Sequence, residues 1–136
     1  VVDTDSFSDL LLAASSALLA GEKDAETLLK DALELFDKRF WDEKQGLTYD
    51  TWNTEFTVLD DYRGLNANMH TVEAFLAVSD AIKEEKYRIR AGRIIDQMEE
   101  RGIISGYQGS KPRQVLMSKE RWEELKMGTP SEDNQE

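Results

Sequence analysis

Two consecutive amphipathic segments near the start of the chain limit the fold most strongly. Residues 7–20 and 24–40 place apolar side chains at the three- and four-residue spacing of a helix. The link "GEKD" favours an antiparallel return, with Gly21 as C-cap and Asp24 as N-cap. The expected apolar stripes comprise Leu10, Leu11, Ala14, Leu18 and Leu19, then Leu28, Leu29, Ala32, Leu35, Phe36 and Phe40. The sequence therefore predicts a helical hairpin.

Helical periodicity returns twice after a long interruption. Residues 41–63 lack a helical period and are rich in threonine and aromatic residues, which predicts a long loop with one short hairpin. Helices follow at 66–82, with Met69 and Val72 toward the buried side, and at 86–101, ended by Gly102. Two short strands near 103–107 and 113–117 and a short helix at 118–126 complete the pattern. The predicted fold class is mainly α, with helical hairpins followed by a small wing-like β-hairpin and a short helix.

Composition restricts the class of protein. The 136 residues are 40% hydrophobic and 33% charged, which is typical of a soluble globular domain. No apolar run approaches the ~20 residues that a membrane span requires, so we expect no membrane partner. Acidic residues before the apolar stretch at 10–20 do not fit a signal peptide. Cysteine is absent, which excludes disulfides and thiolate ligands, and a cytoplasmic location is the expectation by default.

Charge is distributed unevenly along the chain. The net charge is −11, yet residues 1–85 hold 7 Lys/Arg against 19 Asp/Glu, whereas residues 86–127 hold 10 against 6. Residues 128–136 add three acids without a base, and we expect this polar tail to be disordered. Opposite signs in two parts suggest different partners. The alternative is that the basic side chains offset acidic ones across a packed interface.

His70 is the single histidine of the chain, and it lies in the predicted helix at 66–82. Asn66, His70 and Glu73 fall at i, i+4 and i+7, so they share one helix face. An amide, an imidazole and a carboxylate can hydrogen-bond the hydroxyls of a sugar, and an imidazole also transfers protons near neutral pH. The alternative is an ordinary surface pair of His70 with Glu73, and Asn66 as an N-cap. One histidine with scattered carboxylates argues against a metal site.

The stretches "LLLAASSALLAG", "LLKDALELFDKRFWDEKQGLTYDTWN" and "LDDYRGLNANMHTVEAFLAVSDA" carry a resemblance to a known family. Together, over about residues 7–85, they resemble the N-acylglucosamine 2-epimerase superfamily, and "NANMHTVEA" is most similar to its aldose–ketose isomerase branch. The resemblance implies a fragment of a barrel of six helical hairpins with a sugar site at one end and no cofactor. It implies proton transfer through an enediolate, with His70 as catalytic residue and Arg63, Asn66 and Glu73 as substrate-binding residues.

The chain departs from this family in ways that bear on activity. The family uses further histidines on later hairpins, and this chain has no second histidine. Moving a proton between two carbons requires another well-placed acid or base. We therefore expect a fragment of a sugar epimerase or isomerase that is inactive alone.

The segment "RAGRIIDQMEERGIISGYQGSKPRQVLMSKERWEEL" carries a second resemblance, over about residues 88–125. It resembles the end of the C-terminal gamma domain of FtsK-type DNA translocases, a winged-helix module that binds double-stranded DNA. The resemblance implies that Arg90, Arg93, Lys111 and Arg113 contact bases or phosphates. Guanidinium groups suit both, and the local positive charge has the sign that a phosphate footprint needs. The alternative is a helix and hairpin that only pack on the preceding helices.

The two resemblances divide the chain into three predicted parts. Residues 1–85 are the isomerase-like helical fragment, 86–127 the winged-helix-like fragment and 128–136 the acidic tail. The expected partners are a small sugar or, alternatively, double-stranded DNA. The combination looks like a fusion of fragments from two families.

Overall fold

The computed structural model describes residues 2–60, 64–106, 109, 112, 114 and 116. The chain divides into two compact units, Val1–Gln97 and Met98–Glu136. The helices are α1 (Thr4–Leu19), α2 (Asp24–Arg39), α3 (Leu65–Ile82) and α4 (Glu85–Glu100). The predicted boundaries after residues 85 and 127 stay predictions.

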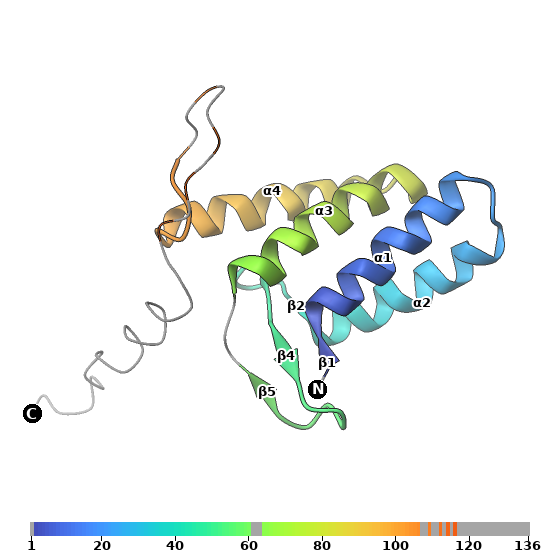
Figure 1. Cartoon of the computed structure of the whole chain (residues 1–136), viewed down its shortest axis with the longest axis horizontal. Helices are drawn as coiled ribbons and strands as arrows, with labels where there is room; N and C mark the ends of the chain where they lie inside the picture. Colours follow the sequence, from blue (N-terminus) through green and yellow to red (C-terminus); the bar gives the residue numbers. More distant parts are fainter. Residues whose placement is uncertain are drawn as a thin grey trace, which may run out of the picture. The chain divides into compact units, whose positions relative to one another are not determined.

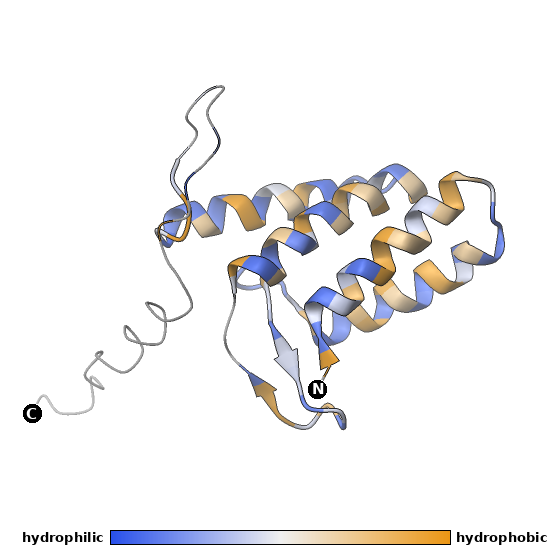
Figure 2. Cartoon of the chain, in the orientation of Figure 1, coloured by the Kyte–Doolittle hydropathy of each residue, from blue (hydrophilic) through white to orange (hydrophobic). Residues whose placement is uncertain are grey.

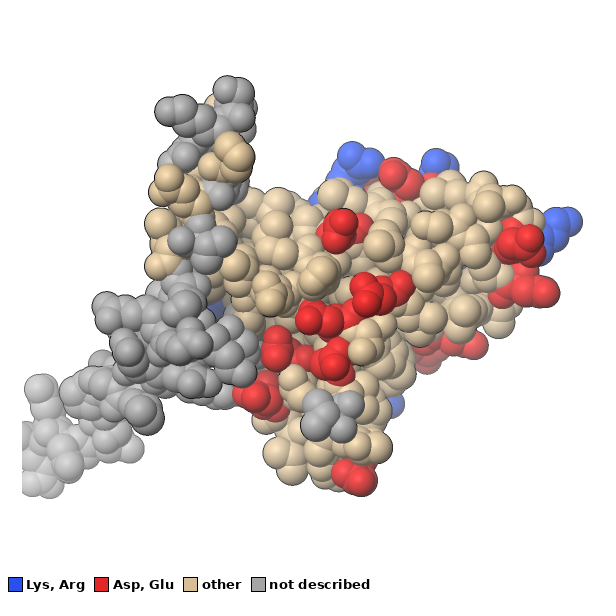
Figure 3. Space-filling view, in the orientation of Figure 1, with Lys and Arg blue, Asp and Glu red and all other residues tan. Residues whose placement is uncertain are grey.

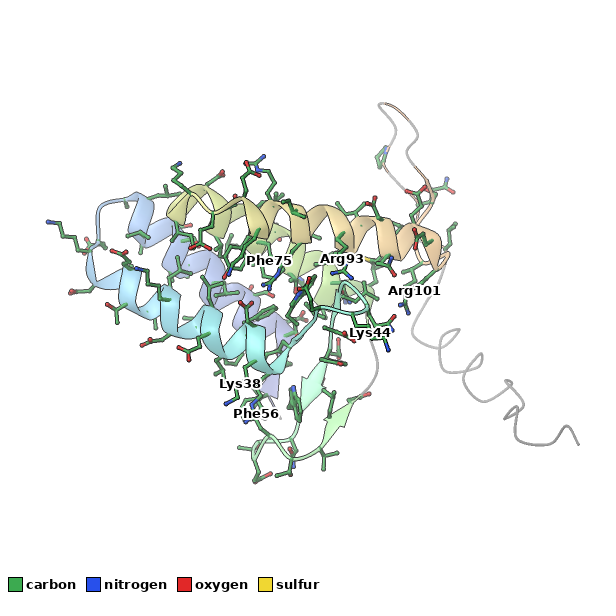
Figure 4. All side chains as sticks on the ribbon, turned by 180° about the vertical axis from the view of Figure 1, so that it is seen from behind. Lys38, Lys44, Phe56, Phe75, Arg93 and Arg101 are labelled. Carbon is green, nitrogen blue, oxygen red and sulfur yellow. The ribbon has the colours of Figure 1, made fainter. Side chains whose placement is uncertain are left out.

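The helices of the first unit form two layers. Helices α1 and α3 run side by side in the same direction, with α2 and α4 returning in the opposite direction behind them (Figure 1). Figure 4, seen from behind, places α2 and α4 in front. The predicted mainly α fold, built from helical hairpins, is confirmed.

The link between α1 and α2 is a hydrogen-bonded C-cap. Gly21 has φ +97°, its N–H donates to the Leu18 carbonyl (3.0 Å), and the N–H of Glu22 donates to the Ala17 carbonyl (3.0 Å). This pattern is a Schellman motif, so the predicted C-terminal role of Gly21 is confirmed. The prediction of Asp24 as N-cap is wrong. Asp24 is the first helical residue, because Lys23 already has helical φ and ψ angles and occupies the cap without a side-chain bond.

The core of the first unit is an aromatic cluster between the helices. Phe36, Phe40 and Phe75 are fully buried, and the Phe36 ring centroid lies 5.6 Å from that of Phe40 and 5.5 Å from that of Phe75. Hydrophobic and hydrophilic residues alternate along every helix, as Figure 2 shows. The predicted apolar stripes are wrong at several positions, because these side chains point to the surface: Leu19, Leu28 and Met69.

The segment between α2 and α3 contains more regular structure than predicted. Strands β2 (Trp41–Asp42) and β3 (Leu47–Thr48) form one hairpin. Strand β4 (Thr51–Trp52) pairs with β5 (Leu59–Asp60) and with β1 (Val2–Asp3), giving the order β1-β4-β5. The prediction of a single hairpin is therefore wrong, since strands of two residues are too short to show an alternating pattern.

The second unit begins within α4. Gly102, at φ +70°, donates its N–H to Glu99, and Ile103 donates to Met98, so Gly102 ends α4 as predicted. The N–H of Ser105 donates to the Gln114 carbonyl (2.8 Å), and that of Leu116 donates to the Ile103 carbonyl (2.7 Å). These two bonds link described residues of the two predicted strands, but no strand is assigned to those residues. Residues 107, 113, 115 and 117 lie outside the described residues, so the prediction of two strands stays a prediction. The predicted helix at 118–126 and the acidic tail lie outside the described residues.

Candidate functional site

The exposed face of α3 carries the predicted polar side chains. Asn66, His70 and Glu73 are all exposed, and Nδ1 of His70 lies 3.8 Å from Oε2 of Glu73. The side chains of His70 and Glu73 are 49% and 70% exposed. This separation allows an ion pair when the imidazole is protonated but is too long for a hydrogen bond. Asn66 is not an N-cap, because that position belongs to Gly64, which makes no side-chain cap.

Asn68 fixes the start of α3, and sequence reasoning missed it. Its side chain is buried, and Oδ1 accepts from the backbone N–H of Thr48 (2.8 Å) and from the Thr48 hydroxyl (3.1 Å). The Nδ2 group donates to the carbonyl oxygens of Gly64 (3.0 Å) and Thr48 (3.4 Å). One amide, two residues before His70, therefore joins strand β3 to the first turn of α3.

The start of α1 is joined to the same loop. The Thr4 hydroxyl donates to the Tyr49 carbonyl, and the Thr4 backbone N–H donates to the Asp50 carbonyl (2.9 Å). Farther along, the hydroxyls of Ser8 and Thr71 lie 3.4 Å apart in the interface between α1 and α3. The first turn of α3 is thus held against β3, and the first turn of α1 against the two residues that follow it.

The face shared by α1 and α3 is acidic. Figure 3 shows Asp and Glu side chains gathered over these two helices. Asp5 and Asp9 of α1 and Glu73 of α3 are exposed. Carboxylates accept hydrogen bonds from hydroxyl groups and stabilise a protonated imidazole. Such a surface can hold a polyhydroxylated ligand around His70, whereas it repels phosphates.

Arg90 is packed inside the first unit. Its guanidinium lies 2.7 Å from Oδ1 of Asp37 and 3.6 Å from Oε2 of Glu43, and its side chain is only 16% exposed. The rings of Trp41 and Tyr87 surround it, with centroids 4.9 Å and 5.4 Å from Cζ. Asp37 accepts from the guanidinium donors of Arg90, and the two rings lie against its faces. A nucleotide would need these same donors and faces of Arg90.

Arg93 holds the turn between β2 and β3 (Figure 4). It donates to Oε1 of Glu43 (3.1 Å) and to the Lys44 carbonyl (3.1 Å). Gly46 in this turn has φ +68°, and a Cβ there would lie 2.5 Å from the Arg93 side chain. The positive φ therefore favours glycine at position 46, and any larger residue would also displace the Arg93 side chain. Arg63, Lys111 and Arg113 lie outside the described residues.

Tyr87 stays neutral within this cluster. Burial, and secondly the Asp37 carboxylate, raise the pKa of its phenol to about 12. A neutral phenol beside Arg90 leaves Asp37 as the main counter-charge of the guanidinium. In the described part of the chain, no group of three or more histidine, cysteine or acidic residues is placed to hold a metal ion. None of the described helices has the length and apolar composition to cross a bilayer.

Comparisons with known proteins identify relatives for most of the chain. The sequence profile of N-acylglucosamine 2-epimerase (GlcNAc 2-epimerase) matches residues 6–108. A D-mannose isomerase from Pseudomonas cannabina pv. alisalensis is 34% identical over 105 residues, covering 77% of this chain and 24% of that protein. The crystal structure of a D-mannose isomerase superposes with a TM-score of 0.69 at 31% identity, covering 74% of this chain and 26% of that one.

A shorter match concerns a different class of protein. The DNA translocase SpoIIIE of Bacillus subtilis is 52% identical over 50 residues, which cover 35% of this chain and 6% of that protein. The chain therefore spans about a quarter of the isomerase relative and a much smaller share of the translocase.

Proposed function

The chain belongs to the N-acylglucosamine 2-epimerase family, and on this basis we propose that it carries part of the sugar site of an aldose–ketose isomerase or epimerase. The observation that carries the proposal is that Asn66, His70 and Glu73 lie together on one exposed face of α3. The ligand is a free hexose, whose hydroxyl groups match the amide, imidazole and carboxylate.

Each residue has a distinct role in this proposal. His70 donates a proton to, or accepts one from, a sugar oxygen during ring opening or enediolate formation. Asn66 orients a neighbouring hydroxyl, and Glu73, 3.8 Å from Nδ1, stabilises the imidazolium that forms. Arg63, which precedes α3 in the sequence, is proposed as a further sugar contact.

Turnover requires more than these groups supply. In the enediolate route, one group removes the proton from C2 and returns it to C1, while a proton moves between the two oxygens. A single imidazole cannot serve both carbon and oxygen at once. We therefore expect binding of the sugar without substantial isomerisation by this chain alone.

The single histidine makes the proposal directly testable, because its imidazole signals in an NMR spectrum need no assignment. Titration with mannose is expected to shift these signals, with a dissociation constant on the order of 10 mM. Asn66→Ala is expected to weaken binding about tenfold through loss of a hydrogen bond worth ~1.4 kcal/mol. Lys30→Ala, on the exposed side of α2, is the control and should bind unchanged.

Two results would contradict this proposal. Unshifted imidazole signals at saturating mannose would exclude a sugar site on α3. Conversion of mannose to fructose at an ordinary enzymatic rate, lost in His70→Ala, would exclude the binding-only role and place a complete active site in this chain.

The match to DNA translocases supports a second candidate function, binding of double-stranded DNA through Lys111 and Arg113. The Asp37 and Glu43 carboxylates already neutralise Arg90, so it contributes least. Duplex binding is expected to weaken steeply with salt, and Lys111→Ala/Arg113→Ala should reduce the slope of log K against log salt by about 2. Lys30→Ala/Lys38→Ala removes the same charge from α2 as a control. Absence of binding at low salt would reject this candidate.

A further inference from the structure

The β4–β5 ribbon carries a groove that the residues of the proposed site do not line. It has a volume of ≈ 360 Å³ and is lined by Thr51, Trp52, Asn53, Val58, Leu59 and Asp60. All six residues belong to β4, β5 or their connecting turn. The groove is thus built from one continuous segment and does not depend on His70.

The floor of the groove includes an aromatic ring held in one orientation. The indole Nε1 of Trp52 donates to the Arg39 carbonyl (2.5 Å). The Arg39 guanidinium lies 5.7 Å from the Trp52 centroid, and the Phe56 ring lies 5.9 Å away. Trp52 nevertheless remains partly exposed. A fixed, partly exposed indole offers a flat apolar surface without the entropy cost of ordering a mobile side chain.

The turn above the floor is also rigid. Oδ1 of Asn53 accepts from the N–H groups of Thr57 (2.8 Å) and Val58 (2.9 Å), and its Nδ2 donates to the Thr57 hydroxyl (2.8 Å). Phe56 has φ +55°, an uncommon conformation for a bulky residue. Strained backbone of this kind persists where surrounding contacts hold it, and it concentrates at ligand sites.

The groove combines apolar and polar groups in a way that selects a class of ligand. Val58, 64% exposed, extends the apolar surface beside Trp52 and Leu59. At the edges, the Asn53 amide has a second N–H and the Thr51 hydroxyl can accept a hydrogen bond. A pyranose ring has a face of C–H groups and a rim of hydroxyls, which match this floor and these edges.

We infer that the β4–β5 groove binds a closed pyranose ring, stacked on Trp52, as a second carbohydrate site. The inference shares its ligand class with the proposed function but does not rest on proton transfer. A sugar held here keeps its ring closed, whereas isomerisation at His70 requires an open chain. The groove therefore acts as a carbohydrate-docking surface and not as a place of reaction.

Methyl α-mannopyranoside separates the two sites, because its ring cannot open. In an NMR titration, the Trp52 indole N–H and the Val58 amide are expected to shift, with a dissociation constant on the order of 10 mM. These shifts should persist in His70→Ala. In Val58→Lys, a change at an exposed position that blocks the groove, the affinity should fall at least about fivefold. Glycerol, which has hydroxyls but no ring face, serves as the control and should leave both signals in place.

The outcomes distinguish this inference from the proposed function. If the glycoside leaves Trp52 and Val58 unshifted, or glycerol shifts them equally, the groove is not a pyranose site, whatever His70 shows. If Val58→Lys binds as tightly as the unmodified chain, the sugar lies elsewhere and the inference is wrong. A mannose shift at His70 alone would leave only the α3 site.

Discussion

Replacing Asn68 by leucine is expected to lower the free energy of unfolding by about 3 kcal/mol, although the side chains are similar in size. The substitution leaves the buried N–H and hydroxyl of Thr48 without their acceptor, whereas the Gly64 carbonyl still accepts from the backbone N–H of residue 68. Each unsatisfied buried group costs roughly 1–3 kcal/mol, and the added apolar surface offsets only part of that cost. Denaturant unfolding followed by circular dichroism measures the difference.

Asn66→Leu is the matched control for this change. It is the same substitution two residues earlier on the same helix, but Asn66 is exposed and makes no helix cap. Its effect on the free energy of unfolding should stay within about 0.5 kcal/mol. Equal effects at the two positions would show that the Asn68 amide does not hold β3 to α3.

The helices could be predicted because their stripes are long and regular. The predicted ranges 24–40 and 66–82 differ from α2 and α3 by a single residue at one end of each. The caps were harder, because a cap depends on the φ and ψ angles of one residue. Asp24 lies inside the first turn, where its carboxylate still favours the helix dipole without capping it.

The polar core residues could not be placed from hydropathy. Asn68 falls on the stripe formed with Val72, Phe75 and Ser79, all of which are buried, so helical spacing alone identifies its position. Asparagine side chains are nonetheless mostly exposed, so burial of Asn68 cannot be predicted unless its hydrogen-bond partners are known. Those partners, Thr48 and Gly64, come from the loop segment, whose two-residue strands give no periodic signal. Met69 is predicted to be buried because it is hydrophobic. It lies one residue away from the buried stripe, and its side chain is exposed.

The candidate site was predictable only in part. The spacing of Asn66, His70 and Glu73 correctly implied one shared face, because helix geometry alone determines it. The surroundings of Arg90 and Arg93 were not predictable, since Asp37 and Glu43 lie about fifty residues earlier in the chain. The expectation that basic side chains offset acidic ones across a packed interface describes these two arginines well.

Replacing Arg90 by alanine is expected to lower the free energy of unfolding by about 3 kcal/mol. The change leaves the Asp37 carboxylate, 29% exposed, without its partner at 2.7 Å, and it removes the cation between Trp41 and Tyr87. Arg88→Ala is the matched control on the same helix. Arg88 is 56% exposed and lies 3.3 Å from an exposed Asp80, so its loss should cost less than about 1 kcal/mol.

A double-mutant cycle with Asp37→Ala separates the ion pair from the packing of the arginine on the rings. The coupling free energy between Arg90 and Asp37 is expected to be about 1–3 kcal/mol, because both side chains are mostly buried. A residue that instead served only to contact DNA would leave stability unchanged when replaced. Arg90→Ala with full stability and lost duplex binding would therefore reverse the assignment of Arg90 from a packing residue to a nucleic-acid contact. Lost stability with zero coupling would assign the effect to the aromatic rings, because the carboxylate then contributes nothing of its own.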